Sequence, residues 1–244
     1  GDPFNELLFN KSIDNIKSMG IFKSVDTDIS DGSQDSLKVV NLTVEEQPTG
    51  EITLGAGAGT GGTTIGGGIK EKNFLGKGIN LNTNLEISES AIKGQFVYSK
   101  PNFAYTDNTL FTSVKSSTKD NLKDYGYKVS NTGFSFGTTY EQYENLFFSP
   151  EIDFSLEDLE TNQTASSSLK KQEGNYEDFY FNYGIIYDLR DSAFRASSGS
   201  KTTFYQNLPI VSGNNEISNT LVYTKYKTLN RSSDLIGKAS LYFK

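Results

Sequence analysis

The chain has 244 residues, a formal net charge of −7, and neither histidine nor cysteine. The acidic balance argues against a nucleic-acid partner, because such proteins normally carry a basic face. Without His and Cys, the usual zinc sites, a Ser-His-Asp triad, Cys-His catalysis and disulfides are excluded within this sequence. We therefore expect neither an enzyme nor a bound cofactor.

The hydropathy of the chain favours strands over helices as any membrane-crossing element. Aromatic residues make up 13% of the sequence, and the mean hydropathy is −0.48. No run of about eighteen apolar residues occurs, so the sequence predicts no transmembrane helix. Transmembrane β-strands alternate apolar and polar residues, so an average of this kind is compatible with them. The chain starts at Gly1 and stops inside a strand-like segment, so we expect a fragment of a longer protein.

Residues 1–20 are the one segment with helical periodicity, and Asp2 is the expected N-cap. Residues 22–29 and 37–44 alternate and are joined by a polar turn, which predicts a β-hairpin. One helix and one hairpin bury too little apolar surface to fold alone, so this α+β unit is expected to be incomplete. The apolar residues of the helix are Phe4, Leu8, Ile13, Ile16 and Met19.

From residue 51 onward the sequence predicts no helix but about eleven alternating strands, each roughly nine to twelve residues long. The alternation is clearest between Ile79 and Ile87, where apolar residues alternate with three asparagines and Glu86. Strands of this length suit a tilted bilayer crossing. They lie near residues 51–59, 63–72, 78–88, 91–100, 109–118, 127–138, 146–157, 176–188, 201–209, 216–227 and 234–243.

The predicted connections alternate between short and long. Residues 72–78 form a tight turn, whereas residues 157–175 form a long polar loop. Long loops on one side and short turns on the other are typical of outer-membrane barrels. Several aromatic residues near strand ends are expected to form girdles at the bilayer surfaces. They are Tyr98, Phe103, Tyr105, Tyr140, Tyr143, Phe147 and Phe148.

Residues 50–68 are rich in glycine, and residues 57–62 match the dinucleotide-binding pattern G-x-G-x-x-G. That motif needs a helix after the glycines, but the next residues are glycine and β-branched residues, which disfavour a helix. We interpret the stretch as two strands, the first with an almost bare face. Ile52, Leu54, Ala56 and Ala58 are predicted on one face, and Thr53, Gly55, Gly57 and Gly59 on the other.

Two acidic clusters resemble functional sites. Asp26, Asp28 and Ser30 have the spacing of a calcium loop, but Asp31 stands at the required glycine position. Asp188 and Asp191 could be paired carboxylates of a hydrolase. The serines that follow them favour a turn held by contacts between Arg190 and a carboxylate.

The order of these features resembles the BamA family, the central subunits of the outer-membrane β-barrel assembly machinery. The resemblance rests on a helix followed by Gly-Ile-Phe, a hairpin, a glycine-rich strand pair and the turn at residues 72–78. It also rests on a turn at residues 188–199 with Asp188, Arg190, Asp191 and Gly199, although Ala196 and Ser197 replace the family's Pro-Thr.

The resemblance implies a mainly β chain with two parts. Residues 1–48 correspond to the C-terminal part of the last POTRA domain, a partial α+β unit in the periplasm. Residues 49–244 correspond to the N-terminal part of an antiparallel transmembrane β-barrel, about eleven of roughly sixteen strands.

The implied function is the assembly and insertion of β-barrel proteins into the outer membrane. The first barrel strand would act as lateral gate and as template for client strands, through residues Ile52, Thr53, Leu54, Gly55, Ala56, Gly57, Ala58 and Gly59. The implied partners are unfolded outer-membrane proteins, accessory lipoproteins of the machinery and outer-membrane lipid. Two alternatives remain: a related POTRA-barrel translocase, either TamA-like or a two-partner secretion transporter, and a passive porin.

Overall fold

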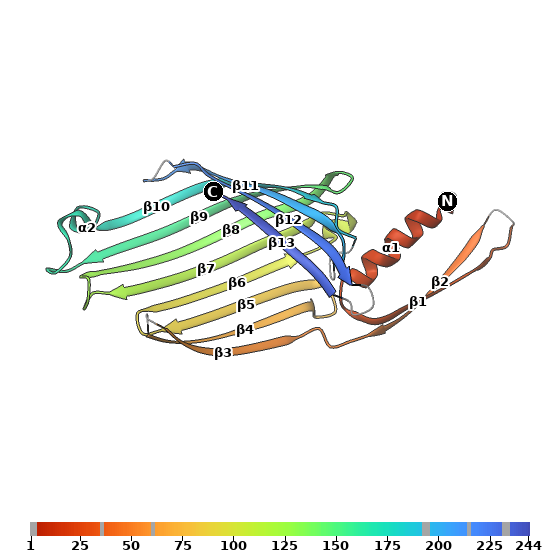
Figure 1. Cartoon of the computed structure of the whole chain (residues 1–244), viewed down its shortest axis with the longest axis horizontal. Coiled ribbons are helices and arrows are strands. Elements are labelled where there is room, and N and C mark those ends of the chain that lie inside the picture. Colours follow the sequence, from red (N-terminus) through yellow and green to blue (C-terminus); the bar gives the residue numbers. More distant parts are fainter. Residues whose placement is uncertain (1–3, 35–36, 60–61, 192–195, 214–215, 231–234) are drawn as a thin grey trace.

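The computed structural model describes residues 4–34, 37–59, 62–191, 196–213, 216–230 and 235–244. A long curved antiparallel sheet holds eleven strands, and a separate two-stranded hairpin with one helix extends from one end of it (Figure 1). Each strand of the large sheet pairs with its neighbours in the sequence, without a crossover. The chain is therefore mainly β, with the small α+β unit at its N-terminal end.

The N-terminal unit consists of α1 (Glu6–Ser18), β1 (Phe22–Asp31) and β2 (Lys38–Glu46). The large sheet consists of β3 (Glu51–Gly59), β4 (Gly62–Phe74), β5 (Ile79–Ser88), β6 (Ala91–Lys100), β7 (Thr109–Asn121), β8 (Tyr127–Tyr143), β9 (Leu146–Thr161), β10 (Gly174–Asp188), β11 (Gly199–Val211), β12 (Ser218–Asn230) and β13 (Leu235–Phe243). A 3₁₀ turn, Phe103–Tyr105, and the short helix α2 (Ser167–Lys171) lie in connections.

The first helix begins one turn later than the sequence predicts. The side chain of Asn5 accepts hydrogen bonds from the N–H groups of Leu7 (2.9 Å) and Leu8 (3.1 Å), so Asn5 is the N-cap. The expected cap, Asp2, lies outside the described residues. Gly20 follows the helix with a φ of 66°, the left-handed conformation that commonly ends a helix.

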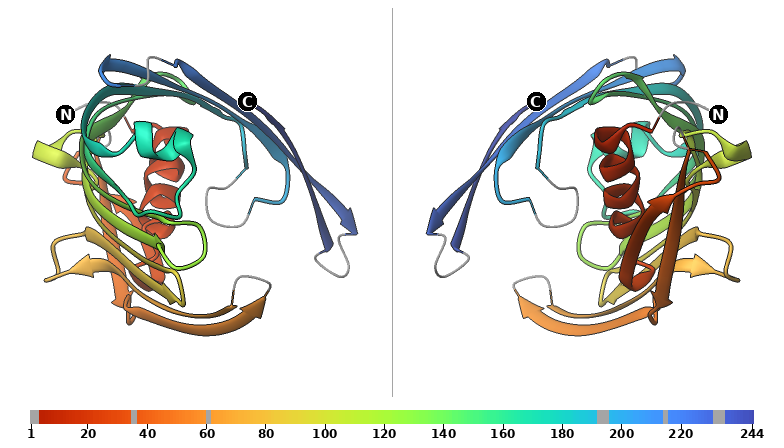
Figure 2. Two further views of the ribbon diagram at one scale, coloured as in Figure 1. Left: turned by 90° about the vertical axis from the view of Figure 1, so that its left-hand side faces the viewer. Right: turned by 90° about the vertical axis from the view of Figure 1, so that its right-hand side faces the viewer.

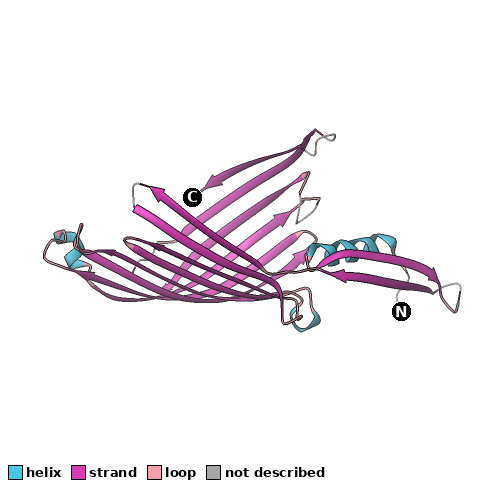
Figure 3. Cartoon of the chain, turned by 90° about the horizontal axis from the view of Figure 1, so that it is seen from below, coloured by secondary structure: helices cyan, strands magenta, loops and turns pink. Residues whose placement is uncertain are grey.

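The predicted N-terminal hairpin is confirmed, with β1 and β2 paired from Phe22–Glu46 to Asp31–Lys38. Helix α1 lies beside it (Figure 3). Every residue of β2 is exposed, so this unit buries little apolar surface. Its assignment to a POTRA domain stays a prediction.

All eleven predicted barrel strands are present, but β8 and β9 are longer than predicted, with 17 and 16 residues. They extend past the apolar segment and shorten the predicted loop after residue 157. Inside that loop the prediction of no helix was wrong. The hydroxyl of Ser166 accepts a hydrogen bond from the N–H of Leu169 (3.2 Å) and caps α2. None of the helices in the described ranges has the length and apolar character to cross a membrane.

The pairing register places the residues of the large sheet on two contrasting faces. Phe96, Val114, Phe134, Phe154 and Phe179 are successive partners across five strands, so they lie on one face. The first four are 38–50% exposed. On the other face Ser135 and Asp153 are only 2% and 7% exposed.

Side chains on the inside of a curved sheet are crowded, so the polar, buried face is the concave one and the apolar face is convex (Figure 2). Two convex hydroxyls, those of Thr112 and Thr138, donate to the carbonyls of Ser135 (2.7 Å) and Thr109 (3.0 Å). Hydroxyls bonded in this way can face lipid at low cost. An apolar convex face and a polar concave face are the pattern of a membrane barrel wall.

The aromatic girdle stays a prediction, and the structure places its candidate residues on different faces of the sheet. Tyr98, Tyr140 and Phe148 lie on the convex face near the end that carries the N-terminal unit. Phe148 contacts Tyr140 and Tyr183, with ring centroids 5.8 and 6.0 Å apart. Phe147 was placed wrongly, because it pairs with Ile186 and therefore points to the concave face.

Candidate functional site

The first strand of the large sheet has one free edge. β3 pairs with β4 from Glu51–Lys70 to Gly59–Gly62, and within the described residues no strand pairs with its other side. β13 is the free strand at the opposite end of the sheet, and Figure 2 shows the two edges apart. The N–H and C=O groups along such an edge are a template for a further strand.

The two faces of β3 differ as the glycine-rich sequence suggests. Ile52 and Leu54, 74% and 87% exposed, lie on the convex face. Ala56 and Ala58 share their parity along the strand. The remaining predicted site residues, Thr53, Gly55, Gly57 and Gly59, have the parity of the concave face. The structure thus places all eight residues on one edge strand, and their functional role stays a prediction.

An open groove of about 700 Å³ is lined by residues of β3 to β6. Its polar side chains belong to the concave face, and five residues of the other parity also line it: Leu54, Ala56, Gly67, Leu85 and Gly94. On β3 the floor of the groove is uncovered backbone. A Cβ added at Gly55 or Gly57 would meet no atom within 4 Å. Its far wall carries charge, since Lys93 Nζ lies 3.4 Å from Glu86 Oε1. The concave-face residues that line it are Thr53, Gly55, Gly57, Thr64, Gly66, Asn84, Glu86, Lys93 and Gln95.

The second predicted site, the turn between β10 and β11, is held by an ion pair. Arg190 donates from Nε to Asp188 Oδ1 (2.7 Å) and from Nη2 to Asp188 Oδ2 (2.6 Å). Lys201 Nζ lies 3.8 Å from the same carboxylate. The turn joins two strands at the end near the N-terminal unit, so the geometry indicates a structural role.

Two further residues of this turn are constrained. Asp191 accepts hydrogen bonds from the hydroxyl of Ser197 and the N–H groups of Ser197 (2.9 Å) and Ser198 (3.1 Å). These bonds lower the pKa of Asp191 from 3.8 to about 2. Gly199 has a φ of 94° and lies against the backbone of Leu189. Residues 192–195 of the predicted motif lie outside the described residues.

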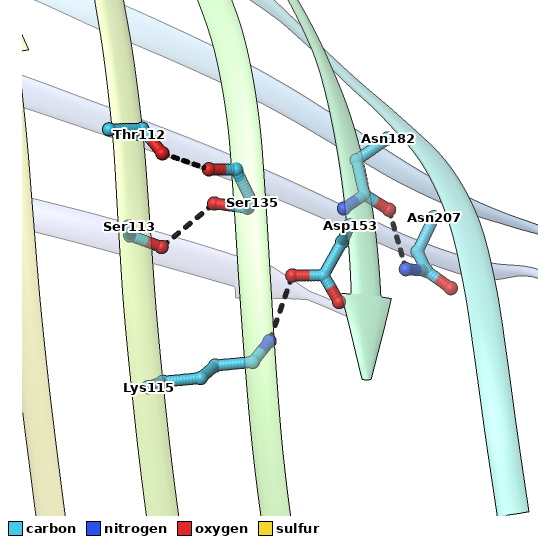
Figure 4. Close-up of polar contacts among 7 residues, drawn as sticks. All are labelled: Thr112, Ser113, Lys115, Ser135, Asp153, Asn182 and Asn207. Atoms are coloured by element: carbon cyan, nitrogen blue, oxygen red, sulfur yellow. Dashed lines mark hydrogen bonds and ion pairs between the residues drawn. The ribbon is translucent and has the colours of Figure 1, made fainter. Parts of the chain in front are cut away.

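Sequence reasoning missed a polar network on the concave face. Lys115 Nζ on β7 reaches Asp153 Oδ2 on β9, 3.0 Å away, across the intervening strand β8 (Figure 4). Ser113 and Ser135 are hydrogen-bonded at 2.7 Å, and Asn207 donates to Asn182 at 2.6 Å. The Asp153 side chain is only 11% exposed. Charged residues in the middle of alternating strands were the available signal.

The reach of Lys115 depends on a glycine. Its stem lies across Gly133, where an added Cβ would come 2.5 Å from Lys115 Cε. In the same way Phe111 lies across Gly137 and Tyr205 across Gly184, where the rings would overlap an added Cβ. In all three cases the glycine is the direct register partner of the long residue in the neighbouring strand. We call these three contacts the glycine-crossing pairs.

A double-mutant cycle tests the Lys115 arrangement. Lys115→Met should lower the free energy of unfolding by about 1–3 kcal/mol, because a nearly buried carboxylate loses its cation. Gly133→Ala should displace the lysine and act through the same loss, so the two effects should not add. Chemical unfolding in detergent micelles measures both.

A matched control is Gly94→Ala on the convex face, whose added Cβ makes only ordinary contacts, 3.9 Å from Leu85 and 4.0 Å from the carbonyl oxygen of Asn84. It should change the stability little. Additive effects of Lys115→Met and Gly133→Ala would contradict the arrangement.

Three comparisons with known proteins found similar sequences and folds, and one of them shows the family. A family model described as the Omp85 superfamily domain matches residues 73–243. A Treponema pallidum (strain Nichols) protein, named as an outer membrane protein assembly factor, is 34% identical over 97 residues. That match covers 37% of this chain and 12% of the relative.

The fold is also similar to the crystal structure of BamA from Haemophilus ducreyi lacking POTRA domains 1–3, with a TM-score of 0.65 at 19% identity. The match covers 95% of this chain and 48% of that structure, so the chain spans about half of its length. The family model alone covers more than half of the chain. The chain therefore belongs to the Omp85 superfamily, as part of an outer-membrane β-barrel protein.

Proposed function

We propose that the protein containing this chain folds β-barrel proteins and inserts them into the outer membrane, with β3 as lateral gate and strand template. The observation that carries the proposal is the glycine-rich first strand of the sheet, β3, whose concave face is glycine at two successive positions. The membership of the Omp85 superfamily and the name of the Treponema relative support it.

The physical task of such a protein is to protect unpaired strand edges from lipid. Each backbone group left without a hydrogen bond there costs several kcal/mol. An edge strand that is free to pair offers a client strand those bonds by β-augmentation. The glycines weaken the pairing of β3, since each glycine in a strand destabilises it by roughly 0.5–1 kcal/mol relative to alanine. A client can then be released.

The partners follow from the same proposal. Clients are unfolded outer-membrane proteins, and outer-membrane lipid surrounds the convex face. The N-terminal unit, residues 1–48, is the end of a POTRA domain in the periplasm, where accessory lipoproteins of the machinery bind. The end of the sheet beside this unit is then the periplasmic one, and the α2 end is extracellular (Figure 1).

Disulfide trapping in the full-length protein tests the template. The described stretch has no native cysteine, so Ala56→Cys and Ala58→Cys can be placed on β3 without competing thiols from it. A client barrel with single cysteines along its terminal strand is then added to proteoliposomes. We expect cross-links in one antiparallel register, so that moving from 56 to 58 shifts the client partner by two residues.

The matched control is Ile65→Cys on β4, the direct partner of Ala56. Both edges of β4 are already paired, so it should give no client cross-link. Cross-links of equal yield from β3 and β4, or none from β3, would contradict the proposal.

A further inference from the structure

The convex face changes character along β7 to β10, towards the end of the sheet that carries α2. These four strands reach beyond β3 to β6 at that end, and each is paired on both sides (Figure 1). Their last apolar residues on the convex face are Val114, Phe134, Leu156 and Phe179. The first three are 45%, 50% and 45% exposed. Lipid tails that cover this face therefore end at the line these residues form.

The next convex side chains form a polar strip. The hydroxyls of Ser116 on β7 and Thr132 on β8 lie 3.3 Å apart, and those of Thr118 and Ser130 also lie 3.3 Å apart. Carboxylates continue the strip on β9 and β10. We use the name polar strip for Ser116, Thr118, Ser130, Thr132, Asp158 and Glu177.

The polar strip lies at the depth of the lipid headgroups. Successive residues on one face of a strand are about 6.8 Å apart. In a strand tilted by about 40° this spacing corresponds to about 5 Å of depth. The headgroup layer on each side of a bilayer is about 5–7 Å thick. The first polar residue beyond the apolar line therefore meets the part of the headgroup that joins the tails.

The charges at that depth do not suit a phospholipid. A phosphate follows the tails directly in a phospholipid, and proteins bind phosphate through Arg or Lys. Lys128 lies farther out on β8, and its Nζ is 3.2 Å from Glu160 Oε1. The first polar residues on the four strands are two hydroxyls and two carboxylates, none of them positively charged: Ser116, Thr132, Asp158 and Glu177.

A sugar ring suits the same groups. Two hydroxyls that share one hydrogen bond keep one O–H donor and three acceptor lone pairs. Carboxylates add acceptors only. A sugar directly attached to the lipid glycerol is uncharged, and its hydroxyls both donate and accept. It therefore offers the donors that the polar strip needs, at the depth where a phospholipid would bring a second negative charge.

We propose that the polar strip binds the sugar headgroup of a neutral glycolipid in the leaflet at the α2 end. The four hydroxyls exchange hydrogen bonds with the ring, and the carboxylates of Asp158 and Glu177 accept from its outer hydroxyls. The inference requires only that the convex face lies in a bilayer. It does not depend on β3 as a template, and it does not involve either edge of the sheet.

The test places the full-length protein in nanodiscs with equal amounts of phosphatidylcholine, phosphatidylethanolamine, phosphatidylglycerol and monogalactosyldiacylglycerol, all with the same acyl chains. Native mass spectrometry of the released protein identifies the lipids that it retains. We expect the galactolipid to be enriched about fivefold over each phospholipid, the effect of about one net hydrogen bond. The double variant Thr118→Val and Thr132→Val removes one hydroxyl from each pair, and it should abolish the enrichment.

The matched control is the double variant Thr112→Val and Thr138→Val. It makes the same two changes on the same two strands and the same face, but inside the apolar line, where both hydroxyls donate to backbone carbonyls. The galactolipid enrichment should stay as in the wild type. Heat-modifiable gel migration checks that both double variants are folded.

A second variant tests the selection against phosphate. Asp158→Asn with Glu177→Gln removes the two carboxylates and keeps their hydrogen-bonding capacity. Phosphatidylglycerol then no longer faces like charges, so its retention should rise about threefold while the galactolipid is still retained. Unchanged retention of phosphatidylglycerol would contradict the role given to these carboxylates.

Three results would overturn the inference. The first is equal retention of all four lipids by the wild type, because the polar strip would then face only water. The second is enrichment of a phospholipid that is lost in Thr118→Val with Thr132→Val. The third is equal loss of galactolipid in both double variants, which would place the lipid elsewhere on the wall. Cross-linking of clients to β3 is a separate measurement, so the proposed function stands or falls independently.

Discussion

A disulfide that ties β3 to the strand beside its free edge in the full-length barrel should reduce client insertion to the rate of empty liposomes. The cysteine on β3 would replace a residue between Leu54 and Ala58, where the strand has no partner on one side within the described residues. A client strand can pair with β3 only when this edge is exposed, and a covalent bond across the edge prevents that exposure. Insertion kinetics before and after reduction measure the effect.

The controls use pairs that the structure already defines. Ala56→Cys with Ile65→Cys joins β3 to its existing neighbour β4, because these residues are direct partners. That lock leaves the free edge open and should leave insertion at the rate of the wild type. Reduction should restore the edge-locked protein. Full activity of the edge-locked protein under oxidising conditions would refute lateral opening.

The strands were predictable because each carries two signals at once. One face meets an apolar medium and the other a polar interior, so the alternation of Ile79 to Ile87 is read directly from the sequence. The strand ends were less predictable. β8 and β9 continue as polar strands to Tyr143 and Thr161, where hydrogen bonding to a neighbour, and not alternation, keeps the chain extended.

The candidate site also has features that the sequence predicts and features that it does not. The bare face of β3 follows from the positions of Gly55 and Gly57, which local sequence shows. The glycine-crossing pairs do not follow from local sequence, because Lys115 and Gly133 become neighbours only through the register of β7 and β8. Phe147 lies on the concave face although it is aromatic, because its parity in β9 and not its residue type decides its face.

The second large effect is expected at Gly199, the first residue of β11. A Cβ at this position would overlap the carbonyl oxygen of Leu189 and lie 2.8 Å from Arg190 Cα. The backbone there has a φ of 94°, which L side chains rarely adopt. Gly199→Ala therefore meets a backbone clash and conformational strain together. It should cost more than about 3 kcal/mol, since strain alone is worth roughly 1–3 kcal/mol.

The comparison with Gly76 isolates the clash. Gly76 also has a positive φ, 68°, but a Cβ added there meets no atom within 4 Å. Gly76→Ala should cost only about 1–2 kcal/mol, the strain of a left-handed residue. Urea unfolding and heat-modifiable migration of the full-length protein measure both variants. Leu189 lies between Asp188 and Arg190, which form an ion pair. If the Leu189 backbone moves away from the added Cβ, it must therefore disturb the turn that joins β10 to β11. An equal loss of unfolding free energy in Gly199→Ala and Gly76→Ala would show that the turn at Leu189 moves and removes the clash.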